Sequence, residues 1–182
     1  MLLDTVGHGT LPAEAFADLL LGAHVEQLVD IRSYPGSRHN PQFNREAMDT
    51  WLAGAGLRYA WLPELSGRRR PQPGSRHVAL RNDAFRGYAD HMETTYFAAG
   101  VERLLEECDR RPTVVMCSES VWWRCHRRLL ADHLVLIRGI DVVHLMHDGR
   151  LTTHPVTDGA RRDQDHVVYD VGATPSLDLR DH

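Results

Sequence analysis

The residues best suited to chemistry stand together in the stretch "MCSESVWWRCHRR", which spans residues 116–128. A cysteine thiolate is a strong nucleophile, and glutamate and histidine side chains can transfer protons near neutral pH. An arginine guanidinium binds phosphate or carboxylate through charge-assisted hydrogen bonds. We therefore expect an active site in this stretch. In it, Cys117, Glu119 and His126 are catalytic, and Cys125 and Arg127 contact the substrate.

Three other interpretations of this stretch stay open. Thiols and imidazoles also bind metal ions, but C-x-E-x5-C-H matches no common zinc spacing, and adjacent residues on a helix point about 100° apart. Cys117 and Cys125 could form a reversible disulfide, although a reducing compartment disfavours one. A structural role would bury both thiols and pair Glu119 with Arg127. Two tryptophans between the cysteines either fill the core or stack on a ligand.

A second group of polar residues follows the first expected strand, in "GHGT" at residues 7–10. The imidazole of His8 could transfer or orient a proton near neutral pH, or it could belong to an ordinary turn. The glycines suggest a G-x-G-x-x-G dinucleotide motif, but its third glycine would fall on Pro12, which makes that interpretation weak. We therefore predict that His8 is one of the catalytic residues, as an orienting group, and does not bind a dinucleotide.

A third group lies in "DIRSYPGSRHN", residues 30–40, directly after another expected strand. Arg32, Ser37 and Arg38 supply the positive charge and the small donors that bind phosphate or carboxylate groups. We predict that these three residues bind the substrate. The alternative is that Arg32 forms an ion pair with a carboxylate such as Asp30 or Glu64.

Alternating strands and helices must bring these groups together. Short apolar runs predict strands, and apolar residues at helical spacing predict helices. Such alternation is typical of an α/β fold in which helices cover both faces of a mostly parallel sheet. Because ligands bind at the carboxyl ends of parallel strands, all three polar groups should meet at one edge. The expected strands lie within residues 2–6, 26–35, 57–63, 113–117 and 140–146, and the expected helices within 13–24, 45–56, 84–111 and 125–139.

Residues 1–154 are expected to form a single α/β domain, and residues 155–182 a C-terminal extension that is weakly structured or docked. The helical pattern of residues 84–111 is expected to break at Gly87 or Gly100. Residues 66–81, rich in arginine, proline and glycine, predict a long loop. In the extension, "HVVYDV" could add an edge strand or dock on a partner.

Composition limits the class of protein. The 182 residues include 42% hydrophobic and 25% charged residues, which is globular composition. Without a recognisable secretion signal or membrane-spanning run, the chain is expected to be cytoplasmic and free of membrane contact. The formal charge of −4 argues against coating nucleic acid through bulk electrostatics. All 21 basic residues are arginine, so no lysine can act as a Schiff base or general base.

Several motifs resemble, in this order, a bacterial and archaeal family known as domain of unknown function 488. They are "TVGHGT", "LVDIRSYPGSRHNPQFN", "GLRYAWLPELSGRRR", "AFRGYADHM" and "MCSESVWWRCHRRLLADHL". The resemblance runs from about Thr5 to about His154, and the combination of C-x-E with C-H-R is its most specific part. It implies a Rossmann-like three-layer sandwich with the polar residues at one end, and it implies no reaction. The matching positions are Gly7, His8, Asp30, Arg32, Pro35, Ser37, Cys117, Glu119, Cys125, His126 and Arg127.

The leading hypothesis is an enzyme that acts on a phosphate-bearing substrate, such as a nucleotide or a nucleic-acid component. One alternative is a binding module without turnover, which would contact a nucleotide or nucleic acid through Arg68, Arg69 and Arg70. Another is a thiol or metal protein centred on Cys117 and Cys125. The sequence names no cofactor.

Overall fold

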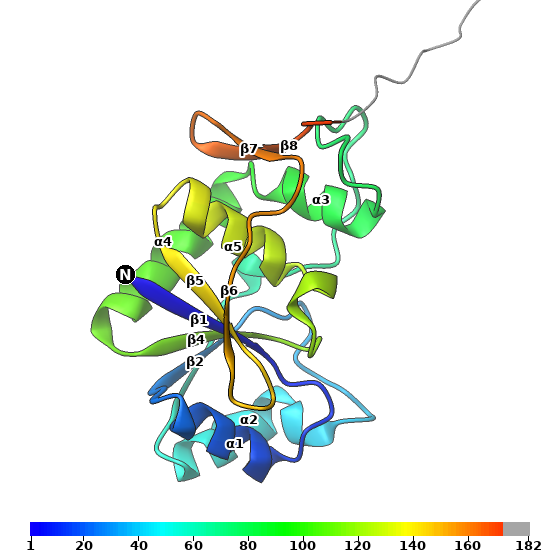
Figure 1. Cartoon of the computed structure of the whole chain (residues 1–182). Helices are drawn as coiled ribbons and strands as arrows, with labels where there is room; N and C mark the ends of the chain where they lie inside the picture. The colour runs from blue at the N-terminus through cyan, green and yellow to red at the C-terminus, as the bar shows by residue number, and fades with distance from the viewer. Residues whose placement is uncertain (173–182) are drawn as a thin grey trace, which may run out of the picture.

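A six-stranded sheet with the order β3-β2-β4-β1-β5-β6 forms the centre of the computed structural model, which describes residues 1–172 (Figure 1). The first five strands in this order are parallel, and β6 pairs antiparallel with β5. The predicted α/β fold with a mostly parallel sheet is confirmed. The strands are β1 (Leu2–Gly7), β2 (Gln27–Asp30), β3 (Arg58–Trp61), β4 (Thr113–Cys117), β5 (Asp141–Leu145) and β6 (Leu151–Thr153).

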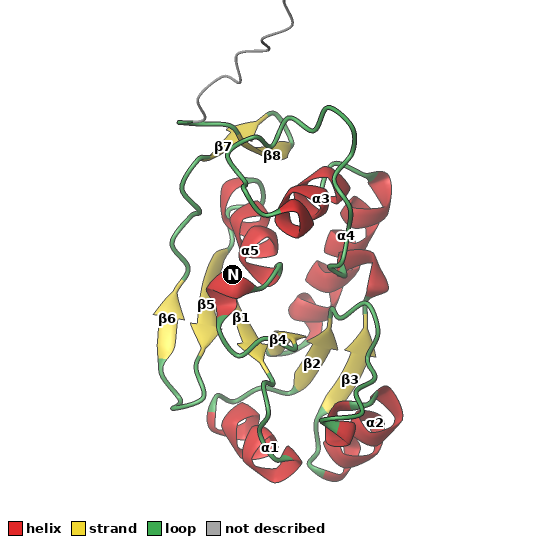
Figure 2. Ribbon diagram, turned by 90° about the vertical axis from the view of Figure 1, so that its right-hand side faces the viewer, coloured by secondary structure: helices red, strands yellow, loops and turns green. Residues whose placement is uncertain are grey.

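Helices cover both faces of the sheet, as in a Rossmann-like three-layer sandwich (Figure 2). On one face, Phe16 and Met48 pack against Val114 of β4 in one hydrophobic cluster. On the other, Phe97 belongs with Val115 to a second cluster. Successive residues of a strand point to opposite faces, so β4 is buried along its whole length. The first face carries α1 (Ala13–Gly22) and α2 (Arg45–Gly54), and the second carries α3 (Asp83–His91), α4 (Thr95–Arg110) and α5 (Arg127–Leu136).

The long helical region is divided between α3 and α4, and the predicted break at Gly87 or Gly100 is wrong. The division comes at Thr94, whose Oγ1 accepts a hydrogen bond from the Phe97 N–H and so caps the second helix. Gly100 has a packing role instead. A Cβ atom there would lie 2.6 Å from the Cβ of Glu64, so glycine lets α4 approach the turn that contains Glu64 closely.

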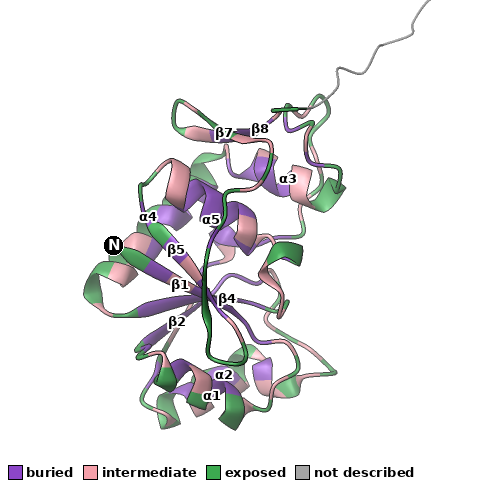
Figure 3. Cartoon of the chain, in the orientation of Figure 1, coloured by how far each residue is buried: buried purple, intermediate pink, exposed green. Residues whose placement is uncertain are grey.

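The C-terminal extension is docked over part of its length. β7 (Ala160–Asp163) and β8 (His166–Tyr169) form a separate antiparallel hairpin, and β8 contacts α3 and α5. The hairpin buries Val167, Val168 and Tyr169 (Figure 3). The segment "HVVYDV" therefore docks on this domain and adds no strand to the six-stranded sheet. Residues 173–182 of the predicted extension lie outside the described part.

Within residues 1–172, no helix has the length and apolar character needed to cross a bilayer.

Candidate active site

A cleft of about 600 Å³ lies where the chain leaves β1, β2 and β4. These three strands are neighbours in the sheet, so the residues that follow them meet at one edge. The expected convergence of the three polar groups is therefore observed. The predicted site residues that line the cleft are His8, Arg32, Ser37, Cys117, Glu119, Cys125 and His126.

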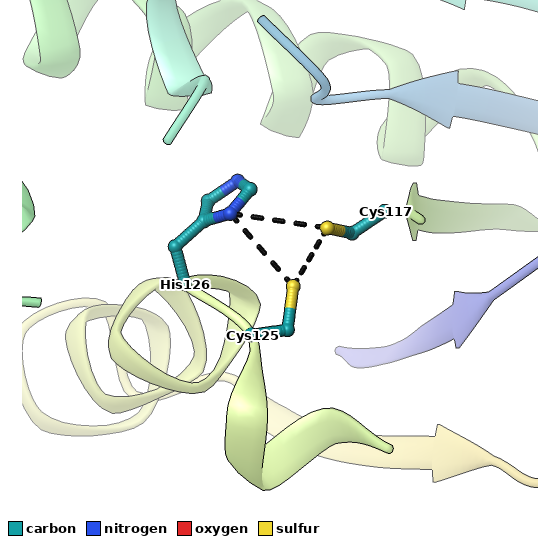
Figure 4. A group of neighbouring side chains, drawn as sticks. All are labelled: Cys117, Cys125 and His126. Carbon is teal, nitrogen blue, oxygen red and sulfur yellow. Dashed lines mark hydrogen bonds between the residues drawn. The ribbon is translucent and has the colours of Figure 1, made fainter. Parts of the chain in front are cut away.

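Two cysteines and a histidine form a tight group in the cleft, which we call the thiol–imidazole cluster: Cys117, Cys125 and His126 (Figure 4). The thiol of Cys125 donates a hydrogen bond to the sulfur of Cys117 over 2.7 Å. The Nδ1 atom of His126 lies 3.8 Å from the Cys117 sulfur and 3.7 Å from the Cys125 sulfur. Both cysteines are free and almost fully buried, yet both line the cleft.

The backbone just before α5 allows the two adjacent residues of the cluster to converge. Cys125 is extended, with φ −118° and ψ 148°, whereas His126 already has helical angles of −60° and −19°. The 100° that separates successive positions inside a helix therefore does not apply to this pair of side chains. The sequence argument against a shared site at 125 and 126 was therefore wrong, because it placed both residues inside the helix.

The two thiols of the cluster differ in their readiness to ionise. The hydrogen bond from Cys125 and the nearby His126 hold the pKa of Cys117 well below its ordinary value, despite the opposing effect of burial. Burial, together with the bond that its thiol donates to Cys117, raises the pKa of Cys125 well above the ordinary value. Cys117 is therefore the thiol of the pair that ionises more readily, and the Cys125 thiol supports its thiolate form.

His8 lies on the loop directly after β1 and is held as a neutral ring. Its Nδ1 lies 2.8 Å from the Gly9 carbonyl oxygen, so Nδ1 carries the proton. Its Nε2 then accepts a bond of 3.2 Å from Nη1 of Arg32. Burial lowers the pKa of His8 to about 4. At neutral pH the ring orients its neighbours and carries no charge.

Arg32 is fixed by an ion pair with Asp30, one of the alternatives that the sequence left open. Its Nε and Nη2 donate to the two carboxylate oxygens of Asp30 over 2.9 and 2.7 Å. Arg32 is 7% exposed and Asp30 fully buried, so this is a buried, forked pair. The carboxylate of Asp30 also accepts a hydrogen bond from the hydroxyl of Tyr59. Arg32 thus lines the cleft as one half of a buried ion pair, with its charge balanced by Asp30.

Arg127 does not line the cleft. Its guanidinium is 1% exposed and donates to the backbone carbonyls of Val6, Glu119 and Ser120 over 3.0, 2.6 and 3.1 Å. Only glycine fits at residue 7 beside it, because a Cβ atom there would lie 1.7 Å from the carbonyl oxygen of Glu119 and 2.5 Å from Nη1 of Arg127. The arginine therefore ties the loop after β4 to β1. The structural alternative paired Arg127 with the Glu119 carboxylate, but the bond goes to the Glu119 carbonyl oxygen instead.

The family model for "Domain of unknown function DUF488" matches residues 12–134. The chain belongs to this family. No curated protein and no solved structure matches it. The part of the chain matched to the DUF488 family includes Arg32 and the whole thiol–imidazole cluster, whereas His8 precedes it.

Two exposed arginines of this DUF488 chain line the cleft and were missed as candidate substrate ligands: Arg68 and Arg124. Arg68 had been considered only as part of a nucleic-acid contact. Arg69, which belongs to the same predicted nucleic-acid contact, donates hydrogen bonds to the backbone carbonyl and the hydroxyl of Ser66. Arg38 is exposed but is not among the lining residues. Positive charge after a strand predicted an anion site, but the sequence could not identify which arginines face it.

Of the two tryptophans, Trp122 stacks on the buried ring of His144, with centroids 4.4 Å apart and planes 7° apart. Trp123 is 46% exposed. Neither is among the residues that line the cleft. Two other aromatic residues are there instead, Tyr34 and Phe85. The aromatic surface of the cleft therefore comes from Tyr34 and Phe85, and not from the tryptophans between the cysteines.

Proposed function

We propose that the cleft is the active site of an enzyme that uses the Cys117 thiolate as a nucleophile on a phosphate-bearing substrate, a nucleotide or a nucleic-acid component. The observation that carries this proposal is the hydrogen bond from Cys125 to Cys117 at the cleft wall. A thiol that receives such a bond ionises more readily than a free one, and the thiolate is the reactive form.

Charge in the cleft supports an anionic substrate. Arg68 and Arg124 are exposed there, and the only carboxylate among the lining residues is that of Glu119. Arginine binds phosphate through forked, charge-assisted hydrogen bonds. The hydroxyls of Ser37, Ser118 and Ser120 add small donors around the same space.

Aromatic residues in the cleft support a substrate that carries a base. Tyr34 is 75% exposed, and Phe85 is half-buried beneath the guanidinium of Arg128. Every nucleic-acid base has a flat face that stacks on such rings. A nucleotide combines this face with a phosphate, which matches the two kinds of group in the cleft.

Proton transfer in this proposal falls to His126 and Glu119. The Nδ1 of His126 lies within 3.8 Å of the Cys117 sulfur, so it can hold the proton that the thiol loses. Glu119 is exposed at the cleft and can transfer a proton to or from the group that leaves the substrate. His8 would act by position, because its Nε2 is engaged by Arg32.

Alkylation by iodoacetamide tests the proposal without a known substrate. We expect Cys117 to be modified with a midpoint below about pH 8.5, the ordinary thiol value, and to be protected by inorganic phosphate or adenosine monophosphate. Arg68→Gln and Arg124→Gln should each raise the half-protecting concentration of phosphate about tenfold, which corresponds to ~1.4 kcal/mol. Modification is mapped by peptide mass.

Two variants are the controls for this experiment. Arg138→Gln removes an arginine that pairs with Glu102 away from the cleft, and should leave protection unchanged. Cys108→Ser removes a thiol whose pKa burial raises to about 12, and should leave the Cys117 rate unchanged. An ordinary pH midpoint at Cys117, or protection that ignores both cleft arginines, would refute the proposal.

A further inference from the structure

We infer that Cys117 is a site of oxidation by hydroperoxides and that Cys125 is its resolving thiol, so that the two close a reversible disulfide across the cleft wall. The disulfide itself depends only on the geometry of the thiol–imidazole cluster. Its effect on turnover rests on the proposed function, because a disulfide would consume the nucleophile.

The arrangement of the two thiols carries the inference. The Cys125 thiol points directly at the Cys117 sulfur, and a single hydrogen bond of 2.7 Å joins them. A resolving thiol must reach the oxidised sulfur before a second oxidant does, and here no chain movement is needed to bring the two into contact. Both cysteines are among the residues that line the cleft, which gives a small oxidant a route to them.

The loop between the cysteines is already fixed in the dithiol form. Arg127 holds the carbonyls of Glu119 and Ser120, and the His8 and Gly9 N–H groups donate to the carbonyls of Cys117 and Ser118. These bonds hold residues 117–120, the first part of the loop, independently of any sulfur bond. Closing the disulfide therefore requires little further ordering of the chain.

The chemistry balances with a hydroperoxide as the oxidant. The Cys117 thiolate attacks the terminal peroxide oxygen, the O–O bond breaks, and a sulfenic acid and an alcohol or water result. Cys125 then attacks the Cys117 sulfur, the S–S bond forms, and the hydroxyl leaves as water with the Cys125 proton. The Nδ1 of His126, 3.7 Å from the Cys125 sulfur, is placed to pass that proton on. A dithiol reductant restores both thiols.

A metal ion is the competing occupant of the same atoms. The two sulfurs and the His126 Nδ1 lie within 4.8 Å of one another, and zinc accepts such donors. A zinc ion and a Cys117–Cys125 disulfide would use the same two sulfur atoms, so the metal content of the chain separates the two occupants.

The test treats the full chain with hydrogen peroxide, then counts thiols after denaturation and measures the intact mass. We expect the loss of two of the three thiols, a mass lower by two hydrogen atoms, and full reversal by dithiothreitol. Cys125→Ser should instead retain a sulfenic acid at Cys117 that reacts with dimedone. Cys125→Ala repeats the dimedone experiment with a side chain that has no hydroxyl. Cys117→Ser should lose no pair of thiols, and Cys108→Ser should behave as the unmodified chain does.

Three outcomes would overturn the inference. They are three intact thiols after peroxide, a disulfide that includes Cys108, or one zinc ion per chain that is lost in Cys117→Ser and blocks oxidation. The two proposals can fail separately. Phosphate protection of Cys117 without disulfide formation would reject only this inference, and disulfide formation without protection would reject only the proposed substrate class.

Discussion

At the scale of single residues, Arg127 shows how a functional-looking side chain can be part of the framework. Its guanidinium is buried and donates to three backbone carbonyls from two segments of the chain. A buried carbonyl without a donor costs about 1–3 kcal/mol. The residue therefore contributes to the candidate site by holding the loop that carries Glu119.

Replacing Arg127 tests this role. Arg127→Ala should lower the free energy of unfolding by about 3 kcal/mol or more, because three carbonyls lose their donor. Arg127→Lys keeps the charge but not the planar fork, so it should recover only part of the loss. Arg138→Ala, which removes a partly exposed ion pair, should cost under about 1 kcal/mol. Urea denaturation measures all three, and equal costs for Arg127→Ala and Arg138→Ala would contradict the framework role.

At the scale of elements, a buried chain of hydrogen bonds connects the sheet to α5. The hydroxyl of Thr5 on β1 lies 2.6 Å from Nδ1 of His144 on β5. Nε2 of His144 is 3.0 Å from His154, which in turn lies 2.8 Å from a carboxylate oxygen of Asp132 on α5. Burial lowers the pKa of His144 to about 3. The chain of bonds therefore requires a neutral ring at His144.

This requirement predicts that acid weakens the fold. Burial also lowers the pKa values of His8 and His133 to about 4. An unfolded histidine has a pKa near 6.5, so between about pH 4 and pH 6.5 the unfolded chain binds more protons. Stability should be full above about pH 6.5 and fall below it, by up to about 1.4 kcal/mol per pH unit for each histidine.

Denaturation at several pH values measures this slope. His144→Gln should reduce the slope between about pH 4.5 and pH 6, whatever it does to stability at pH 7. Exposed His39 offers the matched substitution, His39→Gln, which should keep the slope of the unmodified chain. A slope that is unchanged in His144→Gln would show that this ring is not held neutral by the fold.

At the scale of the whole molecule, the hairpin of β7 and β8 completes the core on the face that carries α5. Tyr169 is fully buried, and its hydroxyl donates to Asp132 over 2.9 Å. The same carboxylate accepts from the Thr157 N–H and contacts His154. Asp132 of α5 is thus surrounded by the C-terminal segment, and the hairpin is part of the domain that forms the cleft.

Two substitutions separate the packing of Tyr169 from its hydrogen bond. Tyr169→Ala should lower the free energy of unfolding by about 3–5 kcal/mol, the usual cost of removing a large buried ring. Tyr169→Phe should cost about 1–3 kcal/mol, because one oxygen of Asp132 loses its donor. Arg162→Ala on the exposed side of β7 should change stability by less than about 0.5 kcal/mol. A negligible cost for Tyr169→Ala would show that the hairpin is dispensable.

Much of the fold could be predicted because its signals are local. The apolar run "TVVMC" is a strand buried on both faces, and the alternation of such runs with helical spacing predicted a parallel sheet. The C-terminal elements carried weaker signals. All three residues of β6 are exposed, and buried and exposed residues do not alternate along β7. Only pairing with a partner strand makes either segment a strand.

The candidate site divides in the same way between sequence and tertiary structure. Residue types and their places at the ends of predicted parallel strands indicated that His8, Arg32 and Cys117 would meet at one edge of the sheet. The sequence could not tell which arginine faces the cleft, that His8 is neutral, or that Cys125 and His126 turn toward the same sulfur. Those outcomes depend on burial, on hydrogen-bond partners distant in the chain, and on the backbone angles where α5 begins. Only the folded chain sets these quantities, because each arises from atoms that the sequence leaves far apart.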